Sequence, residues 1–133
     1  GFFFQDWFER IINNMGDKTT FSKAEGELGG AISHEWIGEL VLRKSDMPSE
    51  LVNAVGLHHV LGDKPEPMTA LVHVAGSITK ELGLGLVEGE SVEYNRTALQ
   101  VLGMKRDDAR NKSKEYADSV KEEVGRLVRD CMS

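Results

Sequence analysis

The stretch SHEWIGELVLRKSDMPSELVNAVGLHHVLGDKPEPMTALVHVA, residues 33–75, decides the fold. Its apolar residues recur at three- and four-residue spacing and do not alternate regularly with polar ones, which predicts helices rather than strands. Ser33 predicts an N-cap for a helix over about residues 34–44, because its hydroxyl can accept a hydrogen bond from a free N–H of the first turn. The inward face of this helix is expected to carry three apolar residues, Ile37, Leu40 and Val41.

Two more helices are expected within the same stretch. Pro48 stands where a first-turn proline belongs and predicts a helix that runs to the pair His58-His59. Residues 62–67 contain turn-forming glycine and proline and predict a loop. A helix through residues 71–78 follows and ends at the glycines of the segment 83–85.

On the amino-terminal side, an apolar stripe over residues 4–15 predicts an amphipathic helix that stops at Gly16-Asp17. Ser22 is followed three residues later by Glu25, which has the form of a capping box for a short helix. The sequence here therefore predicts one long and one short helix.

On the carboxyl-terminal side, Asn95 predicts the cap of a short helix that is stopped by Gly103. The segment 109–131 carries its apolar residues on one face and charges elsewhere, which is typical of a long surface helix. No segment shows strand alternation. The expected fold is all-α, a compact bundle of about five to seven helices.

Composition and charge argue against nucleic acid and membranes as partners. The chain has 133 residues, of which 40% are hydrophobic, enough for one core. Its formal net charge is −6 and it has no Lys/Arg-rich tract, so its field opposes binding to phosphate backbones and anionic lipid. No apolar run reaches the ~18 residues that a membrane helix needs.

The lone Cys131 cannot form an internal disulfide, which fits a reducing compartment. The aromatic amino end lacks the basic segment and the cleavage site of a signal peptide. These features predict a cytoplasmic protein. The sequence starts at Gly1 rather than at methionine, which indicates a processed or excised chain.

All four histidines fall between residues 34 and 73: His34, His58, His59 and His73. Imidazole is the commonest neutral metal ligand, so this clustering raises a metal site as one interpretation. The other interpretation is that each histidine is a hydrogen-bonded, partly buried side chain of its own helix. Spacing by itself leaves both open.

Three motifs, in this order, resemble helices of the HD superfamily and most closely the HDOD output domains of bacterial signalling proteins. Residues 33–42 resemble the HxxIGxxLL helix, and residues 47–55 resemble the LPxxIVxAI helix with its closing histidine pair. Residues 69–75 resemble the xxIVHLAD helix. The resemblance covers roughly residues 30–108 and implies one HDOD-like helical domain over residues 1–133.

In catalytic HD relatives these helices supply metal ligands, so the resemblance assigns that role, as a vestige, to His34, His58 and His59. The sequence departs from the family pattern twice. It has no His-Asp dipeptide, and Gly76 stands where the closing aspartate is expected. Hard divalent cations require anionic oxygen ligands, whereas histidines can still hold a softer ion such as zinc. We therefore expect no cofactor, the alternative being a divalent metal, weakly held at most.

The resemblance implies a non-catalytic regulatory output domain of the HDOD type that acts through protein–protein contacts. The alternative is a metal-dependent HD-type phosphohydrolase acting on a nucleotide or a cyclic dinucleotide. Gly76 and the missing dipeptide favour the first function, so no catalytic or cofactor-binding residue is assigned. In either case the motifs place the histidines on inward turns of neighbouring helices, so all four should approach one another.

The amino-terminal helix is expected to contact a protein partner or a second copy of the chain through Phe3 and Trp7. Residues 2–12 contain more large apolar side chains than one helix face normally buries. Each such side chain gains roughly 1.5–3 kcal/mol on burial, so leaving several in water is costly. Contiguous apolar patches of this kind mark interfaces. The alternative is that this helix folds back over the other helices.

Overall fold

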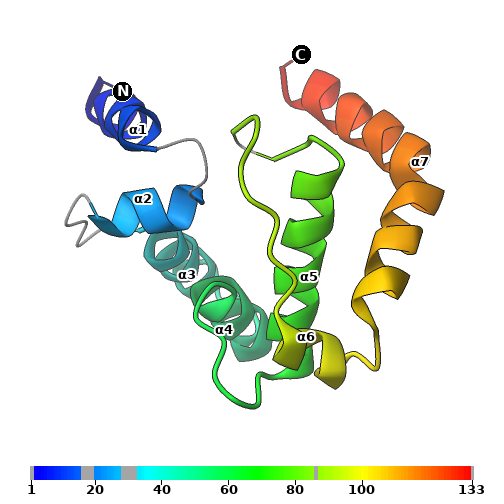
Figure 1. Ribbon diagram of the computed structural model, residues 1–133. Coiled ribbons are helices and arrows are strands. Elements are labelled where there is room, and N and C mark those ends of the chain that lie inside the picture. Colours follow the sequence, from blue (N-terminus) through cyan, green and yellow to red (C-terminus); the bar gives the residue numbers. More distant parts are fainter. Residues whose placement is uncertain (1, 16–19, 28–32, 86, 133) are drawn as a thin grey trace.

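The computed structural model describes residues 2–15, 20–27, 33–85 and 87–132. These residues form seven helices and no strand, which confirms the predicted all-α fold (Figure 1). The expected helix stop at Gly16-Asp17 lies outside the described residues. The helices are α1 (Phe2–Asn14), α2 (Phe21–Glu27), α3 (His34–Lys44), α4 (Ser49–Leu57), α5 (Pro67–Glu81), α6 (Arg96–Val101) and α7 (Arg106–Met132).

Two of the expected helix caps are confirmed. The Ser33 hydroxyl accepts the backbone N–H of Trp36 at 3.2 Å and opens α3. Asn95 Oδ1 accepts the N–H groups of Thr97 and Ala98 at 2.8 and 3.1 Å and opens α6. Pro48 is the N-cap of α4, one position before the first-turn position expected for it.

The capping box expected at Ser22 and Glu25 is wrong, although α2 does form there. The hydroxyl of Thr20 accepts the N–H of Lys23 at 3.3 Å and so takes the capping role. The Ser22 hydroxyl instead donates to a carboxylate oxygen of Glu35, and the Glu25 carboxylate contacts His34. Both side chains are used in tertiary contacts because α2 lies across the start of α3.

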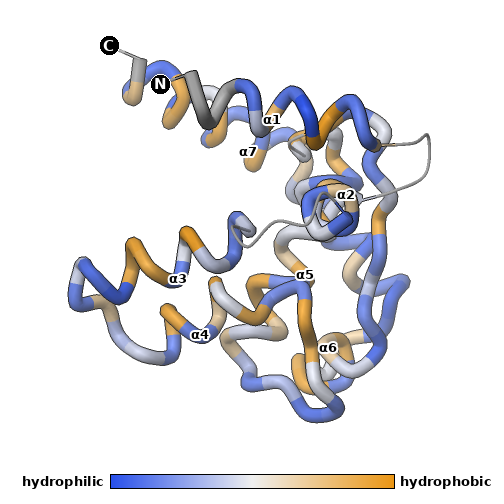
Figure 2. Tube along the Cα trace, turned by 90° about the vertical axis from the view of Figure 1, so that its left-hand side faces the viewer, coloured by the Kyte–Doolittle hydropathy of each residue, from blue (hydrophilic) through white to orange (hydrophobic). Residues whose placement is uncertain are grey.

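Helices α3 and α4 form an antiparallel pair that projects from the rest of the molecule (Figure 2). The helices come close at Gly38, where an added Cβ would lie 2.6 Å from Val55 Cγ1. The inward position expected for Leu40 and Val41 is wrong, because these side chains are 40% and 55% exposed. Helix α4 covers the Gly38 side of α3 and leaves these two side chains in solvent.

The largest core cluster lies between α5, α6 and the start of α7. It consists of the buried residues Ala70, Val74, Ala98, Leu99 and Ala109. Small residues dominate this cluster, so the three helices approach closely. Further along α7, Leu127 and Val128 are about half exposed. The apolar face predicted for α7 is therefore buried mainly near its beginning.

A second cluster joins α1 to α2 through the buried residues Ile11, Phe21 and Ala24. Trp7 is half-buried against this cluster, so the described part of α1 folds onto α2. The side chain of Phe3 lies outside the described residues, and a partner at the Phe3/Trp7 helix stays a prediction. None of the described helices is both long and apolar enough to cross a bilayer.

Candidate functional site

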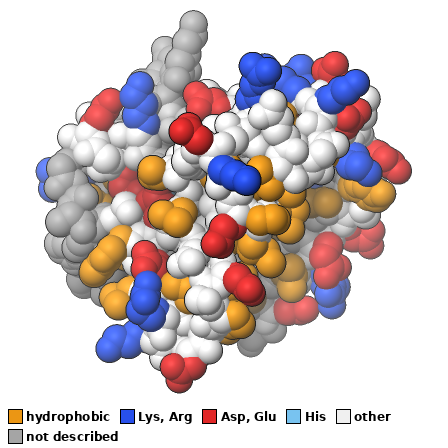
Figure 3. All heavy atoms as spheres, turned by 90° about the horizontal axis from the view of Figure 1, so that it is seen from below, with side chains coloured by type: hydrophobic (Ala, Val, Ile, Leu, Met, Phe, Trp, Pro, Cys, Tyr) orange, Lys and Arg blue, Asp and Glu red, His pale blue; other side chains and the backbone are white. Residues whose placement is uncertain are grey.

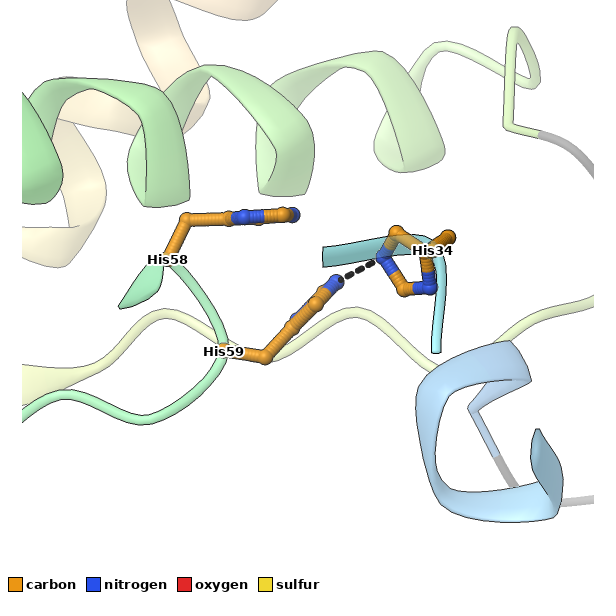
Figure 4. A group of neighbouring side chains, drawn as sticks. All are labelled: His34, His58 and His59. Atoms are coloured by element: carbon orange, nitrogen blue, oxygen red, sulfur yellow. Dashed lines mark hydrogen bonds between the residues drawn. The ribbon is translucent and has the colours of Figure 1, made fainter. Parts of the chain in front are cut away.

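Three histidines meet where α3 begins and α4 ends. His34 is the first residue of α3, His58 is the C-cap of α4, and His59 follows it (Figure 4). The antiparallel pairing of the two helices brings these ends together. The ring centroids are 5.6 Å apart for His34 and His58, 5.0 Å for His34 and His59, and 4.0 Å for His58 and His59. One ring nitrogen from each histidine lies within 4.8 Å of the other two.

Hydrogen bonds on the outer side of the cluster engage the Nδ1 atoms of His34 and His58. His58 Nδ1 is 2.7 Å from the carbonyl oxygen of Val55, which can only accept, so Nδ1 carries the proton and Nε2 keeps its lone pair. His34 Nδ1 is 2.8 Å from a carboxylate oxygen of Glu25. On the inner side, His34 Nε2 and His59 Nε2 are hydrogen-bonded at 3.1 Å, so one of them carries a proton that must leave before both can bind the same metal ion.

These positions suit a transition metal with imidazole ligands. Zinc binds histidine nitrogen at about 2.0–2.1 Å, so two such nitrogens on a tetrahedral ion lie about 3.3–3.4 Å apart. The 3.1 Å between His34 Nε2 and His59 Nε2 is close to that separation. Three histidines leave one position of a tetrahedron open. The cluster can therefore hold a zinc-type ion with small side-chain movements.

Two buried carboxylates lie behind His34, on the side away from the cluster. The Glu25 side chain is 5% exposed, and its two oxygens accept the backbone N–H and the ring Nδ1–H of His34 at 3.0 and 2.8 Å. The Glu35 side chain is 11% exposed, and its Oε2 lies 3.5 Å from His34 Nδ1. This oxygen is buried and has no hydrogen-bond partner within the described part of the chain.

Neither carboxylate was predicted from the sequence, because neither stands at a position where the HD-like motifs have a ligand. Glu25 and Glu35 contact the Nδ1 side of the ring, so they are not ligands on the Nε2 side where the three histidines face one another. They place two negative charges next to the cluster. A bound divalent cation would balance that charge, including the charge on the unpaired Glu35 oxygen, so the residues present fit a metal ion.

The histidine pair is held in the neutral form that ligates metals. Burial lowers the pKa of His59 to about 4, and repulsion from His58 and His34 adds to this effect. Burial also lowers the pKa of His58, against the opposing effect of its bond to the Val55 carbonyl. Burial raises the pKa of Glu35, but hydrogen bonds and the charge of His34 outweigh burial, so this pKa lies below its usual range. Glu35 is therefore ionised beside the cluster.

His73 lines the same cleft as the other three histidines, as their expected approach requires, but it does not belong to the group whose ring nitrogens lie within 4.8 Å of one another. Its Nδ1–H donates to the carbonyl oxygen of His58 at 2.8 Å, and its Nε2 accepts the N–H of Asn95 at 3.3 Å. Both nitrogens are thus engaged with backbone groups. His73 therefore links the middle of α5 to the end of α4 and to the cap of α6. For this residue, the interpretation as a hydrogen-bonded side chain of its own helix applies.

A cleft of about 620 Å³ opens beside the cluster, between α2, α5 and the segments 84–85 and 90–93. All four histidines line it, together with Gly76 and Lys80. An added Cβ at Gly76 would have no atom within 4 Å, so α5 leaves open space at this position. Lys80 is paired with the buried Glu90 at 2.9 Å. The three histidines therefore stand in the wall of a cleft whose lining is both polar and apolar.

Comparison with protein families, with curated protein sequences and with solved structures found no match for this chain.

The metal-free protein is expected to unfold more easily as the pH falls from 7 to 5. The pKa of His59 is about 4 in the folded chain and about 6.5 in an unfolded one, so the unfolded state binds more protons below pH ~6.5. The free energy of unfolding then decreases as the pH falls toward 4. Urea unfolding in EDTA at pH 7 and at pH 5 measures the decrease.

The His59→Gln variant removes this titration and should show a smaller difference between the two pH values. Carboxylates common to both proteins titrate equally in each and cancel in the comparison. An equal difference in the wild type and the variant would contradict the prediction.

Proposed function

We propose that this chain is a non-catalytic regulatory domain of the HDOD type, which acts through protein–protein contacts and whose three-histidine cluster binds a zinc-type ion. One observation carries the proposal. The ring nitrogens of His34, His58 and His59 lie within 4.8 Å of one another, while Gly76 lines the same cleft without a side chain.

Gly76 supports a regulatory rather than a hydrolytic domain. In the HD-type enzymes that the motifs resemble, divalent metals held by histidines together with carboxylates activate water for attack on phosphorus. In HD-type enzymes the resemblance places an aspartate ligand at the position of Gly76. Glu25 and Glu35 do not replace it, because they contact the far side of the His34 ring. A centre of three neutral imidazoles favours zinc, cobalt or nickel over magnesium.

Exposed apolar side chains support a role in protein contacts. On α3, Trp36 is 50% exposed, and Leu40 and Val41 are exposed beside it. Helix positions 36 and 40 are four residues apart and share a face. Seen from below, the molecule also carries hydrophobic side chains scattered among acidic and basic ones (Figure 3). Large apolar groups that stay in water in the isolated chain are candidates for burial against a partner.

Metal titration of EDTA-treated protein tests the proposal. Zinc is expected to bind at one ion per chain, and magnesium at millimolar concentration is not expected to displace it. The same zinc-loaded protein is expected to leave bis(p-nitrophenyl) phosphate and cyclic dinucleotides intact over hours. Failure to bind zinc would rule out the metal centre.

The second candidate function is an HD-type phosphohydrolase acting on a nucleotide or a cyclic dinucleotide. The observation that favours it is the open cleft beside the histidines, which is large enough for a small-molecule substrate. Steady hydrolysis that needs zinc or manganese, and that disappears in the His59→Ala variant, would place this function first.

A further inference from the structure

Glu25 stands apart from the other acidic residues because it reaches His34 from a separate helix. It lies on α2, nine positions before His34, and its side chain is buried. One of its oxygens accepts the first backbone N–H of α3, and the other accepts the ring Nδ1–H of the same residue. These two bonds fix both the position of the His34 backbone and the rotation of its ring.

The bond to Nδ1 also decides which nitrogen of His34 is free. A carboxylate can only accept a hydrogen bond from a neutral ring, so Nδ1 carries the proton and Nε2 presents its lone pair to the cluster. Metal-binding histidines commonly donate their other N–H to a carboxylate, which orients the ring and raises its basicity. Glu25 has the position and the burial that this role requires.

We propose that Glu25 is a positioning residue of the histidine centre: it orients His34 and supplies negative charge to a bound cation without ligating it. The proposal rests on zinc binding by His34, His58 and His59. Glu25 makes its contacts with His34 from α2, at the point where α2 lies across the start of α3.

Glu90 provides a matched control. Its carboxylate is buried like that of Glu25 and holds the same helix, because Oε1 accepts the N–H of Phe21 at 2.8 Å. Its other contact is the ion pair with Lys80. Glu90 therefore secures α2 without contacting any of the three histidines. A variant at Glu90 measures how much a weaker attachment of α2 changes the zinc affinity, separately from the effect of Glu25 on His34.

The test is zinc affinity of the full chain, measured by competition with a chromophoric chelator at pH 7.5. The Glu25→Gln variant keeps the side-chain shape and removes the charge. Its Kd for zinc is expected to rise about 10-fold or more, because loss of a residue that orients a metal ligand typically weakens metal affinity about 10- to 100-fold. Glu25→Asp keeps the charge and should recover part of the loss. Glu90→Gln should stay within about threefold of the wild type.

Equal Kd values for the wild type and Glu25→Gln would overturn the inference and leave zinc binding by the cluster intact. Equal losses in Glu25→Gln and Glu90→Gln would also overturn it, because the effect would then come from holding α2. Absence of zinc binding in the wild type would instead remove the proposed function on which the inference rests.

Histidine-ring NMR of the metal-free wild type at pH 8 gives a second readout that needs no variant to fold. It is expected to find the His34 proton on Nδ1. A proton on Nε2 would overturn the inference, since the ring would then present no lone pair to the cluster.

Discussion

Replacing His59 by alanine is expected to weaken zinc binding by more than about 100-fold. The variant removes one of three imidazoles whose nitrogens lie within 4.8 Å of one another. Loss of a residue that only orients a metal ligand typically weakens metal affinity about 10- to 100-fold. The loss of a ligand itself should therefore exceed that range. Competition with a chromophoric chelator measures the change, and metal analysis of the dialysed protein gives the stoichiometry.

His73→Gln is the matched control for this prediction. His73 lines the same cleft, but both of its ring nitrogens are engaged with backbone groups. The variant should therefore keep one zinc per chain, although it loses stability. Similar losses of zinc in the His59 and His73 variants would show that general damage to the cleft, and not the loss of a ligand, explains the effect.

Local sequence signals predicted the helices well because caps and helical periodicity act over a few residues. Ser33 and Asn95 cap α3 and α6 as expected, since the bonds of an N-cap are made within its own first turn. The same kind of signal failed at Ser22 and Glu25. The spacing fits a capping box, but the carboxylate gains more from two bonds to His34 than from one bond to its own helix.

The histidine site was predictable in outline but not in its partners. The order of the motifs placed His34 at the start of one helix and His58-His59 at the end of the next, and an antiparallel pair brings such ends together. The sequence gives no measure of which nitrogens are already engaged. His73 shares the apolar helix pattern of the others, yet the backbone of residues 58 and 95 uses both of its nitrogens.

The carboxylates were missed for a related reason. Glu35 directly follows His34 on α3, whereas Glu25 comes from α2, so the approach of Glu25 depends on how α2 lies across α3. That packing is a tertiary property, set by contacts such as the buried Glu90 with the first turn of α2. The positions of the three histidines at the helix ends follow from local sequence signals. The contact between Glu25 and His34 forms only when α2 packs against α3.

Helices α3 and α4 pack closely at Gly38, and the Gly38→Val variant is expected to lose about 2–3 kcal/mol of stability. An added Cβ lies 2.6 Å from Val55 Cγ1, and both side chains would be stiff at their first torsion, so the clash requires α3 and α4 to separate. Because His34 and His58-His59 stand at the paired ends of these helices, zinc binding should weaken as well. Urea unfolding and zinc competition on the same samples measure both effects.

Two alanine variants give this prediction a sharp control, since the same substitution should act with opposite signs at two helical glycines. At Gly76 an added Cβ has no atom within 4 Å, so Gly76→Ala should gain up to about 1 kcal/mol from the helix propensity of alanine. Gly38→Ala should lose stability despite the same gain in propensity. Adding Val55→Ala to Gly38→Ala removes the clashing methyl groups, so the double variant should lose less than the sum of its single changes. Stabilisation by alanine at Gly38 would show that the space between α3 and α4 can hold an added methyl group. That result would contradict the close packing that positions the histidines.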